Sequence, residues 1–209
     1  EPATQPWLMA LPWAPNYTSE AAIDVAYARA KNPNARFAVL YQNDDAGKDY
    51  GNGFKKGLGP ENTAKMVVAE TTYESTDPTV DSQIVKLKAS GANVLFMHAI
   101  PKQAAQAIKK IGEIGWKPDM FFLAATSTSV SSVLKPAGFE YSKDIISSYS
   151  LKDPNDPQWK DDAGMKAFDD LLAKAIAHHA ASESGLPVPP RTVALSPETE
   201  IDRWAPKQG

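Results

Sequence analysis

The stretch that decides the fold is FAVLYQNDDAGKDYGNGF, at residues 37–54. It begins with an apolar run of strand length, changes abruptly to amides and carboxylates, and resumes after Gly47 with the helical spacing of Phe54 and Leu58. This pattern predicts a strand, a loop and a helix. Because ligands of open α/β sheets usually bind at the carboxyl ends of the strands, residues 43–47 are the first candidate for a binding loop.

The same alternation recurs along the chain and predicts an α/β fold: a doubly wound, mostly parallel five-stranded sheet with helices on both faces. Residues 93–99 are apolar throughout, as expected of a strand that is buried on both faces of a parallel sheet. The simplest order of the strands is the flavodoxin-like 2-1-3-4-5. The first expected strand begins at Phe37, and the other four cover residues 65–72, 93–99, 120–125 and 144–151.

The pattern divides the chain into three parts. Residues 1–19 are rich in proline and tryptophan and are predicted to form a hinge segment that leads into the lobe. Residues 20–177 are predicted to form a single α/β ligand-binding lobe. Its last helix runs from about residue 159 or 161 to residue 177, with an apolar stripe facing inward at Met165, Phe168, Leu171, Leu172 and Ile176. Residues 178–209 have no periodic pattern and are predicted to be an irregular tail.

Composition argues against several classes of function. The chain has 209 residues with a formal net charge of -3, so it has no general attraction for nucleic acid, and we expect no nucleic-acid partner. The absence of cysteine removes thiol catalysis, disulfides and cysteine metal sites. No apolar run approaches the roughly 20 residues that span a bilayer, and no signal peptide is visible in these residues.

Spacing disfavours two ligand classes that are common in this fold. A dinucleotide site needs Gly-x-Gly-x-x-Gly directly after the first strand, whereas residues 51–53 come about ten residues after Tyr41 and Gly57 is one position too late. A phosphoacceptor domain needs an aspartate at the end of the third strand, where this chain has residues 97–99, Met-His-Ala. We therefore expect no cofactor.

Metal binding and catalysis have little support. His178 and His179 are adjacent and would diverge by about 100° on a helix, so we expect no metal site. His98, at a strand end, either contacts a ligand or bonds to a neighbouring loop. The serines at 127–132 lie in no Gly-x-Ser-x-Gly elbow. They line a strand end, where they either only cap a helix or also present backbone amides to an anion. The sequence offers no pair of a nucleophile and a base, so we do not expect enzymatic activity. The alternative is a small flavodoxin-like enzyme or regulatory domain that uses the strand-end crevice.

The acidic pair and the glycine of the first loop each allow two interpretations. Asp44 and Asp45 either cap the following helix or contact a ligand. Gly47 has no side chain, so it permits close approach by a ligand or by a facing domain.

Several motifs follow one another from residue 7 to about residue 176. They are PNY at 15–17 with EA at 20–21, AVLYQNDD at 38–45 with GKDY at 47–50, TDPTVDSQIVKLKASGA at 76–92, PK at 101–102, GWKP at 115–118 and LKPAG at 134–138. In this order they resemble the periplasmic solute-binding proteins of branched-chain amino-acid type ABC transporters, which have the type I binding-protein fold.

The resemblance implies two lobes, of which this chain covers the second. The first lobe of the same protein would precede Glu1. The resemblance also implies a periplasmic or otherwise extracytoplasmic protein that closes on a small-molecule solute by hinge motion and hands it to a membrane permease. Because an isolated lobe exposes the face that meets its partner lobe, we expect that face to be available for a homodimer.

Carried over position by position, the resemblance places ligand contacts at three strand ends. These contacts are Asp45, Ala46 and Gly47 after the first strand, His98, Ala99 and Ile100 after the third, and Ala125, Thr126 and Ser127 after the fourth. Ala46 stands where the family often has an aromatic residue, and no acid stands at 124–127, where amino-acid binders commonly hold the ligand ammonium. An unpaired ammonium in a closed cleft would cost on the order of several kcal/mol. The hypothesis is therefore an aromatic or aliphatic carboxylate, unless Asp44 or Asp45 pairs with an amino acid.

Overall fold

The computed structural model describes residues 15–149, 152 and 157–183. Contacts divide the chain into two compact units, Glu1–Leu151 and Lys152–Gly209. The greater part of the predicted hinge segment, residues 1–14, lies outside the described residues, as do residues 184–209 of the predicted tail. Within the described ranges, no helix combines the length and the apolar character that a membrane crossing requires.

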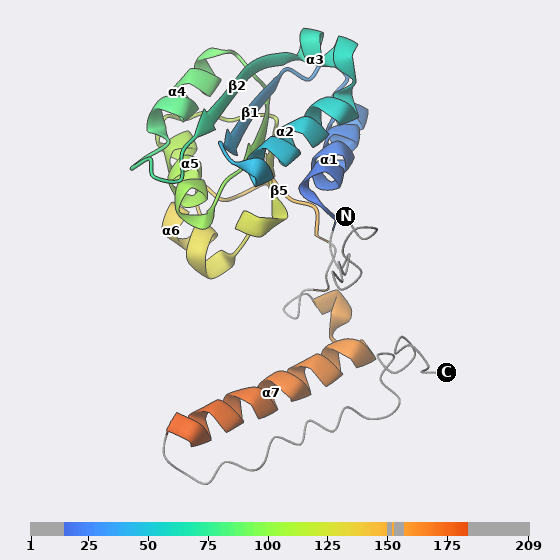
Figure 1. Cartoon of the computed structure of the whole chain (residues 1–209), viewed down its shortest axis with the longest axis vertical. Helices are drawn as coiled ribbons and strands as arrows, with labels where there is room; N and C mark the ends of the chain where they lie inside the picture. The colour runs from blue at the N-terminus through green and yellow to red at the C-terminus, as the bar shows by residue number, and fades with distance from the viewer. Residues whose placement is uncertain (1–14, 150–151, 153–156, 184–209) are drawn as a thin grey trace, which may run out of the picture. The chain divides into compact units, whose positions relative to one another are not determined.

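The first unit is built on a five-stranded parallel sheet in the order β2-β1-β3-β4-β5 (Figure 1). Both the α/β class and the predicted strand order are confirmed. The strands are β1 Phe37–Gln42, β2 Val67–Tyr73, β3 Val94–His98, β4 Met120–Leu123 and β5 Ile145–Ile146. Since every strand runs in the same direction, all carboxyl ends lie at one edge of the sheet.

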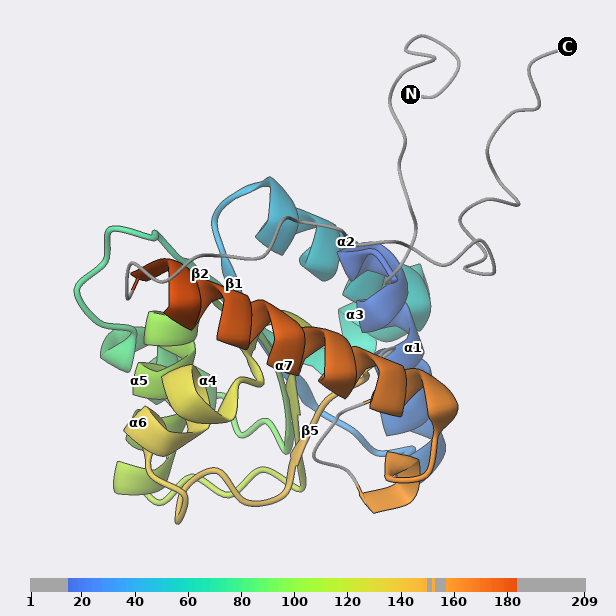
Figure 2. The same cartoon turned by 90° about the horizontal axis from the view of Figure 1, so that it is seen from below.

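Helices cover both faces of this sheet, with α1 and α2 on one side and α4 and α5 on the other (Figures 1 and 2). The α-helices of the first unit are α1 Tyr17–Lys31, α2 Asp45–Leu58, α3 Pro60–Met66, α4 Asp81–Ala89, α5 Pro101–Glu113 and α6 Lys135–Ala137. A 3-10 turn at Ala125–Ser127 and a π-helical turn at Val130–Leu134 follow β4. This arrangement is the doubly wound architecture that the alternation of strands and helices predicts.

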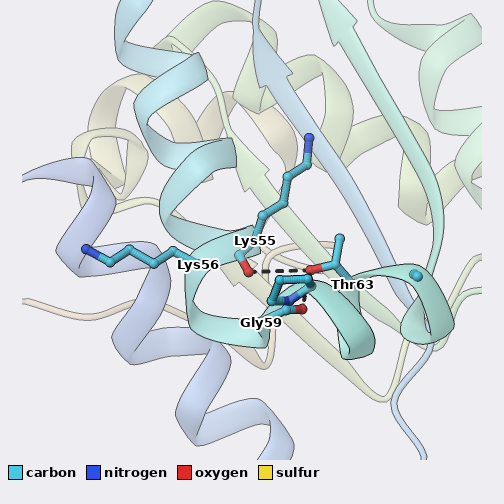
Figure 3. A pocket seen from close by; sticks show the side chains of 6 residues that line it. Lys55, Lys56, Gly59 and Thr63 are labelled. Atoms are coloured by element: carbon cyan, nitrogen blue, oxygen red, sulfur yellow. Dashed lines mark hydrogen bonds between the residues drawn. The ribbon is translucent and has the colours of Figure 1, made fainter.

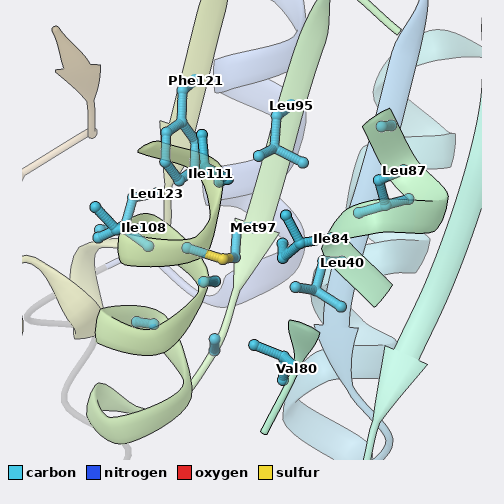
Figure 4. Packing of buried hydrophobic residues seen from close by; sticks show 14 of the residues in the cluster. Leu40, Val80, Ile84, Leu87, Leu95, Met97, Ile108, Ile111, Phe121 and Leu123 are labelled. Carbon is cyan, nitrogen blue, oxygen red and sulfur yellow. The ribbon is translucent and has the colours of Figure 1, made fainter. Parts of the chain in front are cut away.

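The face of the sheet under α4 and α5 has a mainly aliphatic core (Figure 4). Alternate strand residues such as Leu40, Leu95 and Met97 point to this face and pack against Ile84 of α4 and Ile108 of α5. All five are fully buried. Their period of two in the strands and the matching helical stripes explain why this layer closes.

The opposite face, under α1 and α2, has an aromatic core. Phe96 of β3 stacks on Phe122 with ring centroids 4.5 Å apart, and Phe54 of α2 meets it edge-on at 4.9 Å. Helix α1 approaches α2 very closely at Gly53, where an added Cβ would lie 2.3 Å from the Thr18 carbonyl oxygen. A glycine at this position is what lets the two helices touch.

Several element boundaries differ from the prediction. Helix α1 begins at Tyr17, inside the predicted hinge segment, because the Asn16 side chain accepts a hydrogen bond from the Ser19 amide and caps it. Helix α3 was not predicted, and it starts at Pro60 directly after Gly59, whose φ of 76° ends α2. Strand β5 has only two residues, far fewer than the predicted 144–151.

The second unit contains the 3-10 turn Pro157–Trp159 and the 21-residue helix α7, Ala163–Glu183. The helix extends six residues beyond the predicted end at 177, because alanines at 177, 180 and 181 are strong helix formers. Within the second unit the side chains of Phe168, Leu171, Leu172 and Ile176 are 46–60% exposed, and their inward orientation stays a prediction. Periodicity determines which residues share a face, but not what covers it. The extent of the lobe to residue 177 stays a prediction.

Candidate functional site

The predicted contact residues gather at the carboxyl edge of the sheet, where β1, β3 and β4 end side by side. Their accessibility divides them into two groups. The accessible residues, called the rim from here on, are Asp45, Ala46, Ile100, Ala125 and Thr126. The other four, Gly47, His98, Ala99 and Ser127, are buried. The residues of the rim are accessible to a solute, whereas the four buried residues can only act through the residues that they contact.

The loop after β1 is held by its own side chains. Asp44 is the N-cap of α2, and its Oδ1 accepts a hydrogen bond from the Gly47 amide at 2.8 Å. Its Oδ2 accepts a hydrogen bond from the Gln42 side-chain amide. A Cβ on Gly47 would lie 1.9 Å from the Gln42 carbonyl oxygen. Asp44 therefore takes the capping role, and the close approach at Gly47 is made by the chain itself.

The loop after β3 is tied to the loop after β1 by a residue that sequence reasoning missed. Tyr73, the last residue of β2, is 1% exposed. Its hydroxyl accepts a hydrogen bond from the Ile100 amide at 2.9 Å and donates one to Gln42 Oε1 at 3.0 Å. The only hint in the sequence is an aromatic residue just past the predicted strand end, directly before the polar turn at 74–78.

The loop after β4 is connected in the same manner. The Ser127 hydroxyl donates to the Ala99 carbonyl, and Ser127 has no exposed surface. The Ala125 amide donates to Glu20 Oε1 at 2.7 Å, across 105 residues of sequence. Ser129 caps the π-helical turn by accepting from the Ser132 amide. In this serine cluster the described contacts of Ser127 and Ser129 are thus structural.

His98 is buried between two aromatic rings. Its ring centroid lies 4.6 Å from that of Tyr17 and 5.2 Å from that of Tyr50. Neither ring nitrogen has a hydrogen-bond partner among the described residues. Burial lowers the pKa of His98, so the imidazole is neutral near pH 7, although the charge of Asp44 opposes part of the shift. As a ligand contact, His98 stays a prediction.

Two buried acids of α1 lie beneath the β4 end of this edge. Burial raises the pKa of Glu20, and the Ala125 amide partly offsets this effect. Burial and the charge of Glu20 raise the pKa of Asp24 to about 6. Burial, followed by the charges of both acids, also raises the pKa of Tyr50. Sequence reasoning missed these acids, although their four-residue spacing places them on the helix face that carries buried Ala21 and Ala28.

A separate groove lies at the far end of α2. It lies at the junction of α2 and α3 (Figure 3). Its volume is about 550 Å³. Its lining residues are Lys55, Lys56, Gly59, Pro60, Thr63 and Ala64. Lys55 is paired with Glu70 at 2.7 Å, and the Thr63 hydroxyl donates to the Gly59 carbonyl at 2.8 Å. None of the predicted contact residues lines this groove.

Metal binding has no support among the described side chains. No group of three or more His, Cys, Asp or Glu residues that could hold a metal ion occurs among them. Ser127 is engaged with the Ala99 carbonyl, and His98 lies between Tyr17 and Tyr50. What the edge offers is a rim of short side chains held by a hydrogen-bonded scaffold, which suits binding.

Comparison with solved structures shows the same architecture. A substrate-binding periplasmic protein from Ralstonia solanacearum matches with a TM-score of 0.64 and 19% identity, over 82% of this chain and 44% of that one. A type 1 periplasmic binding protein from Bordetella pertussis Tohama I matches with a TM-score of 0.54 and 13% identity, over 62% and 33% of the two chains.

A third match is a solute-binding protein of an ABC transporter from R. palustris, in complex with 4-hydroxybenzoate. It has a TM-score of 0.51 and 15% identity, over 59% of this chain and 33% of that one. At these identities the matches establish the fold. This chain spans less than half the length of each of the three structures. No curated protein matches it.

The model of one protein family, described as periplasmic binding protein, matches residues 2–184, which is most of the chain. The match agrees with the parallel sheet in the order β2-β1-β3-β4-β5 and with the solved structures above. The chain therefore belongs to the periplasmic binding protein family, and it has the fold of the type 1 periplasmic binding protein from Bordetella pertussis.

Proposed function

We propose that this chain is the second lobe of an extracytoplasmic solute-binding component of an ABC importer, and that its rim forms one wall of the solute cleft. The observation that carries the proposal is the placement of the rim: Asp45, Ala46, Ile100, Ala125 and Thr126 are accessible at three adjacent strand ends of one sheet edge. In open α/β sheets this edge is where ligands bind. The other wall would come from a first lobe of the same protein.

The proposed solute is a small carboxylate, aromatic or aliphatic, with an amino acid as the competing candidate. At the end of β4 the accessible groups are those of Ala125 and Thr126, and neither supplies a negative charge for a ligand ammonium. Asp45, exposed at the start of α2, is the nearest candidate for that task in the rim. The 4-hydroxybenzoate bound by the R. palustris protein shows that this fold accommodates an aromatic acid.

The first experiment is a calorimetric titration of the protein that contains this chain together with its first lobe. We expect 4-hydroxybenzoate or a related carboxylate to bind more tightly than leucine. Tight binding of leucine without binding of any aromatic acid would reject the carboxylate hypothesis. Binding of neither class, nor of any other small solute in a screen, would reject the solute-binding function.

The second experiment tests the rim itself. Thr126→Ala removes an exposed hydroxyl from the β4 end, and we expect the affinity for the solute to fall by about fivefold or more, as for one lost hydrogen bond. Thr63→Ala is the matched control, because Thr63 lies in the groove at the opposite end of α2. An equal loss of affinity in both variants would place the site elsewhere.

The partners follow from the same proposal. A membrane permease would receive the solute after the two lobes close. A homodimer through the exposed lobe face also stays a prediction. Sedimentation of the 209-residue chain over a range of concentrations tests it, and a monomer at every concentration would remove it.

A further inference from the structure

We propose that Tyr73 is a positioning residue that fixes the loops after β1 and β3 in one mutual geometry, through a hydroxyl that bonds to both. This inference rests on the proposed function of these loops as one wall of a solute cleft. Tyr73 itself is 1% exposed and lies at the end of β2, so it acts on a solute through Ile100 and the Asp44 cap.

A continuous hydrogen-bonded path runs between the two loops. It begins at the Gly47 amide, which donates to Asp44 Oδ1, and passes from Asp44 Oδ2 to the Gln42 side-chain amide. Gln42 Oε1 then accepts from the Tyr73 hydroxyl, which in turn accepts from the Ile100 amide. The path thus links the first turn of α2 to the residue that directly precedes α5.

The carboxylate of Asp44 dictates the direction of each hydrogen bond in this path. An ionised carboxylate only accepts, so the Gln42 group facing Asp44 is the NH2, and Gln42 Oε1 faces Tyr73. The Tyr73 hydroxyl must therefore donate to Gln42 and accept from Ile100. A group that donates once and accepts once is required here, and Phe offers neither function.

The main chain adds a third connection at the same point. The Asn43 amide donates to the Tyr73 carbonyl at 2.8 Å, so both the backbone and the side chain of Tyr73 bond to the β1 end. The loop after β3 has a weaker connection to Tyr73, which is made through Ile100. Ile100 is a rim residue, 37% exposed, and its amide donates a hydrogen bond to the Tyr73 hydroxyl. Loss of that hydroxyl should therefore loosen Ile100 first.

The test is amide hydrogen exchange, followed by NMR, in Tyr73→Phe of the 209-residue chain. We expect the Ile100 amide to exchange about tenfold faster than in the wild type, as for one lost hydrogen bond. The Gly47 amide should accelerate to a smaller degree. Amides of the β3 core, such as Phe96, should keep their rates, so that loosening of the loops is separated from loss of overall stability.

Tyr41→Phe is the matched control. It also removes a tyrosine hydroxyl that donates a hydrogen bond, but its acceptor is Glu70 and it touches neither loop. Faster exchange at Ile100 in Tyr73→Phe alone supports the proposal. An unchanged Ile100 rate in Tyr73→Phe, or the same acceleration in Tyr41→Phe, overturns it. Failure of the wild-type protein to bind any solute would overturn the proposed function, whereas the exchange result concerns the loops alone.

Discussion

The two faces of the central sheet are built from different side chains. The face under α4 and α5 is closed mainly by aliphatic residues, and the buried Gln103 of α5 donates to the carbonyls of Ser75 and Asp77. The face under α1 and α2 combines stacked phenylalanines with the buried acids Glu20 and Asp24.

The polar groups of the second face lie where the face reaches the candidate site. Glu20 accepts a hydrogen bond from the Ala125 amide of the rim, and His98 is the last residue of β3 at the same edge. Atoms of Asp24, Tyr50 and His98 are buried without a hydrogen-bond partner among the described residues, and so are the Oε1 atoms of Gln103 and Gln106 on α5. Both faces therefore stabilise the lobe and support the candidate edge, the first through Tyr73 and the second through Glu20, and each keeps buried polar atoms without described partners at some loss of stability.

The largest expected effect tests the aromatic core. Phe96→Ala should lower the free energy of unfolding by about 3–5 kcal/mol, because it removes a fully buried ring that contacts three other phenylalanines. Leu95→Ala, on the aliphatic face, is the partner measurement. Urea denaturation of both variants compares the faces, and a smaller loss for Phe96→Ala than for Leu95→Ala would contradict the importance given to the aromatic layer.

The next effect concerns the contact between α1 and α2. Gly53→Ala should destabilise the chain by about 1–3 kcal/mol, because its Cβ would lie 2.3 Å from the Thr18 carbonyl oxygen. Asn52→Ala, at the exposed neighbouring position of the same helix, serves as the control and should be neutral or slightly stabilising. A stabilised Gly53→Ala variant would show that the two helices can separate without loss.

The acid cluster predicts a pH-dependent stability. The pKa of Asp24 is raised from 3.8 to about 6, so folding takes up a proton between these values, and wild-type stability falls as the pH rises through that window. Asp24→Asn cannot ionise, so at pH 7.5 it should be more stable than the wild type by about 1 kcal/mol after allowance for solvent screening. The gain should shrink toward pH 4.

Thermal unfolding at several pH values measures this difference. Asp49→Asn, which replaces an exposed aspartate on α2, is the control and should show no comparable gain at pH 7.5. A gain for Asp24→Asn that is the same at pH 4 and pH 7.5 would show that the charge of Asp24 is not its cause.

The smallest expected effect comes from Tyr50→Phe. The Tyr50 hydroxyl is buried and has no hydrogen-bond partner among the described residues, so its removal should change the free energy of unfolding by less than about 1 kcal/mol, toward higher stability. Denaturation measurements check this value. A loss above 1 kcal/mol would reveal a partner for the hydroxyl, such as a buried water.

Much of the first unit could be predicted from local patterns. The apolar run at 37–41 and the helical spacing of Phe54 and Leu58 identified β1 and α2, and the alternation along the chain identified the strand order. The element boundaries that were predicted wrongly depend on single residues. Asn16 extends α1 into the predicted hinge segment, and Gly59 allows α3 to start directly after α2.

The position of the candidate site could be predicted from the sequence, but the accessibility and the contacts of its residues could not. The family resemblance put nine residues at three strand ends, and the structure separates them into a rim and a buried group. Gly47 and Ser127 illustrate the limit, since each makes its close contact with another part of the chain itself. Glu20 and Tyr73 were missed because their partners, Ala125 and Ile100, are distant in sequence.

The sequence by itself therefore determined the class of fold and the order of the strands, and it identified the sheet edge that we propose as the binding site. Hydrophobic periodicity and turn residues are local properties, and chain direction places all carboxyl ends of a parallel sheet together. Only the tertiary structure decided which strand-end residues are accessible and which side chains hold them. Accessibility and long-range hydrogen bonds depend on what packs against each residue, and no local pattern contains that information.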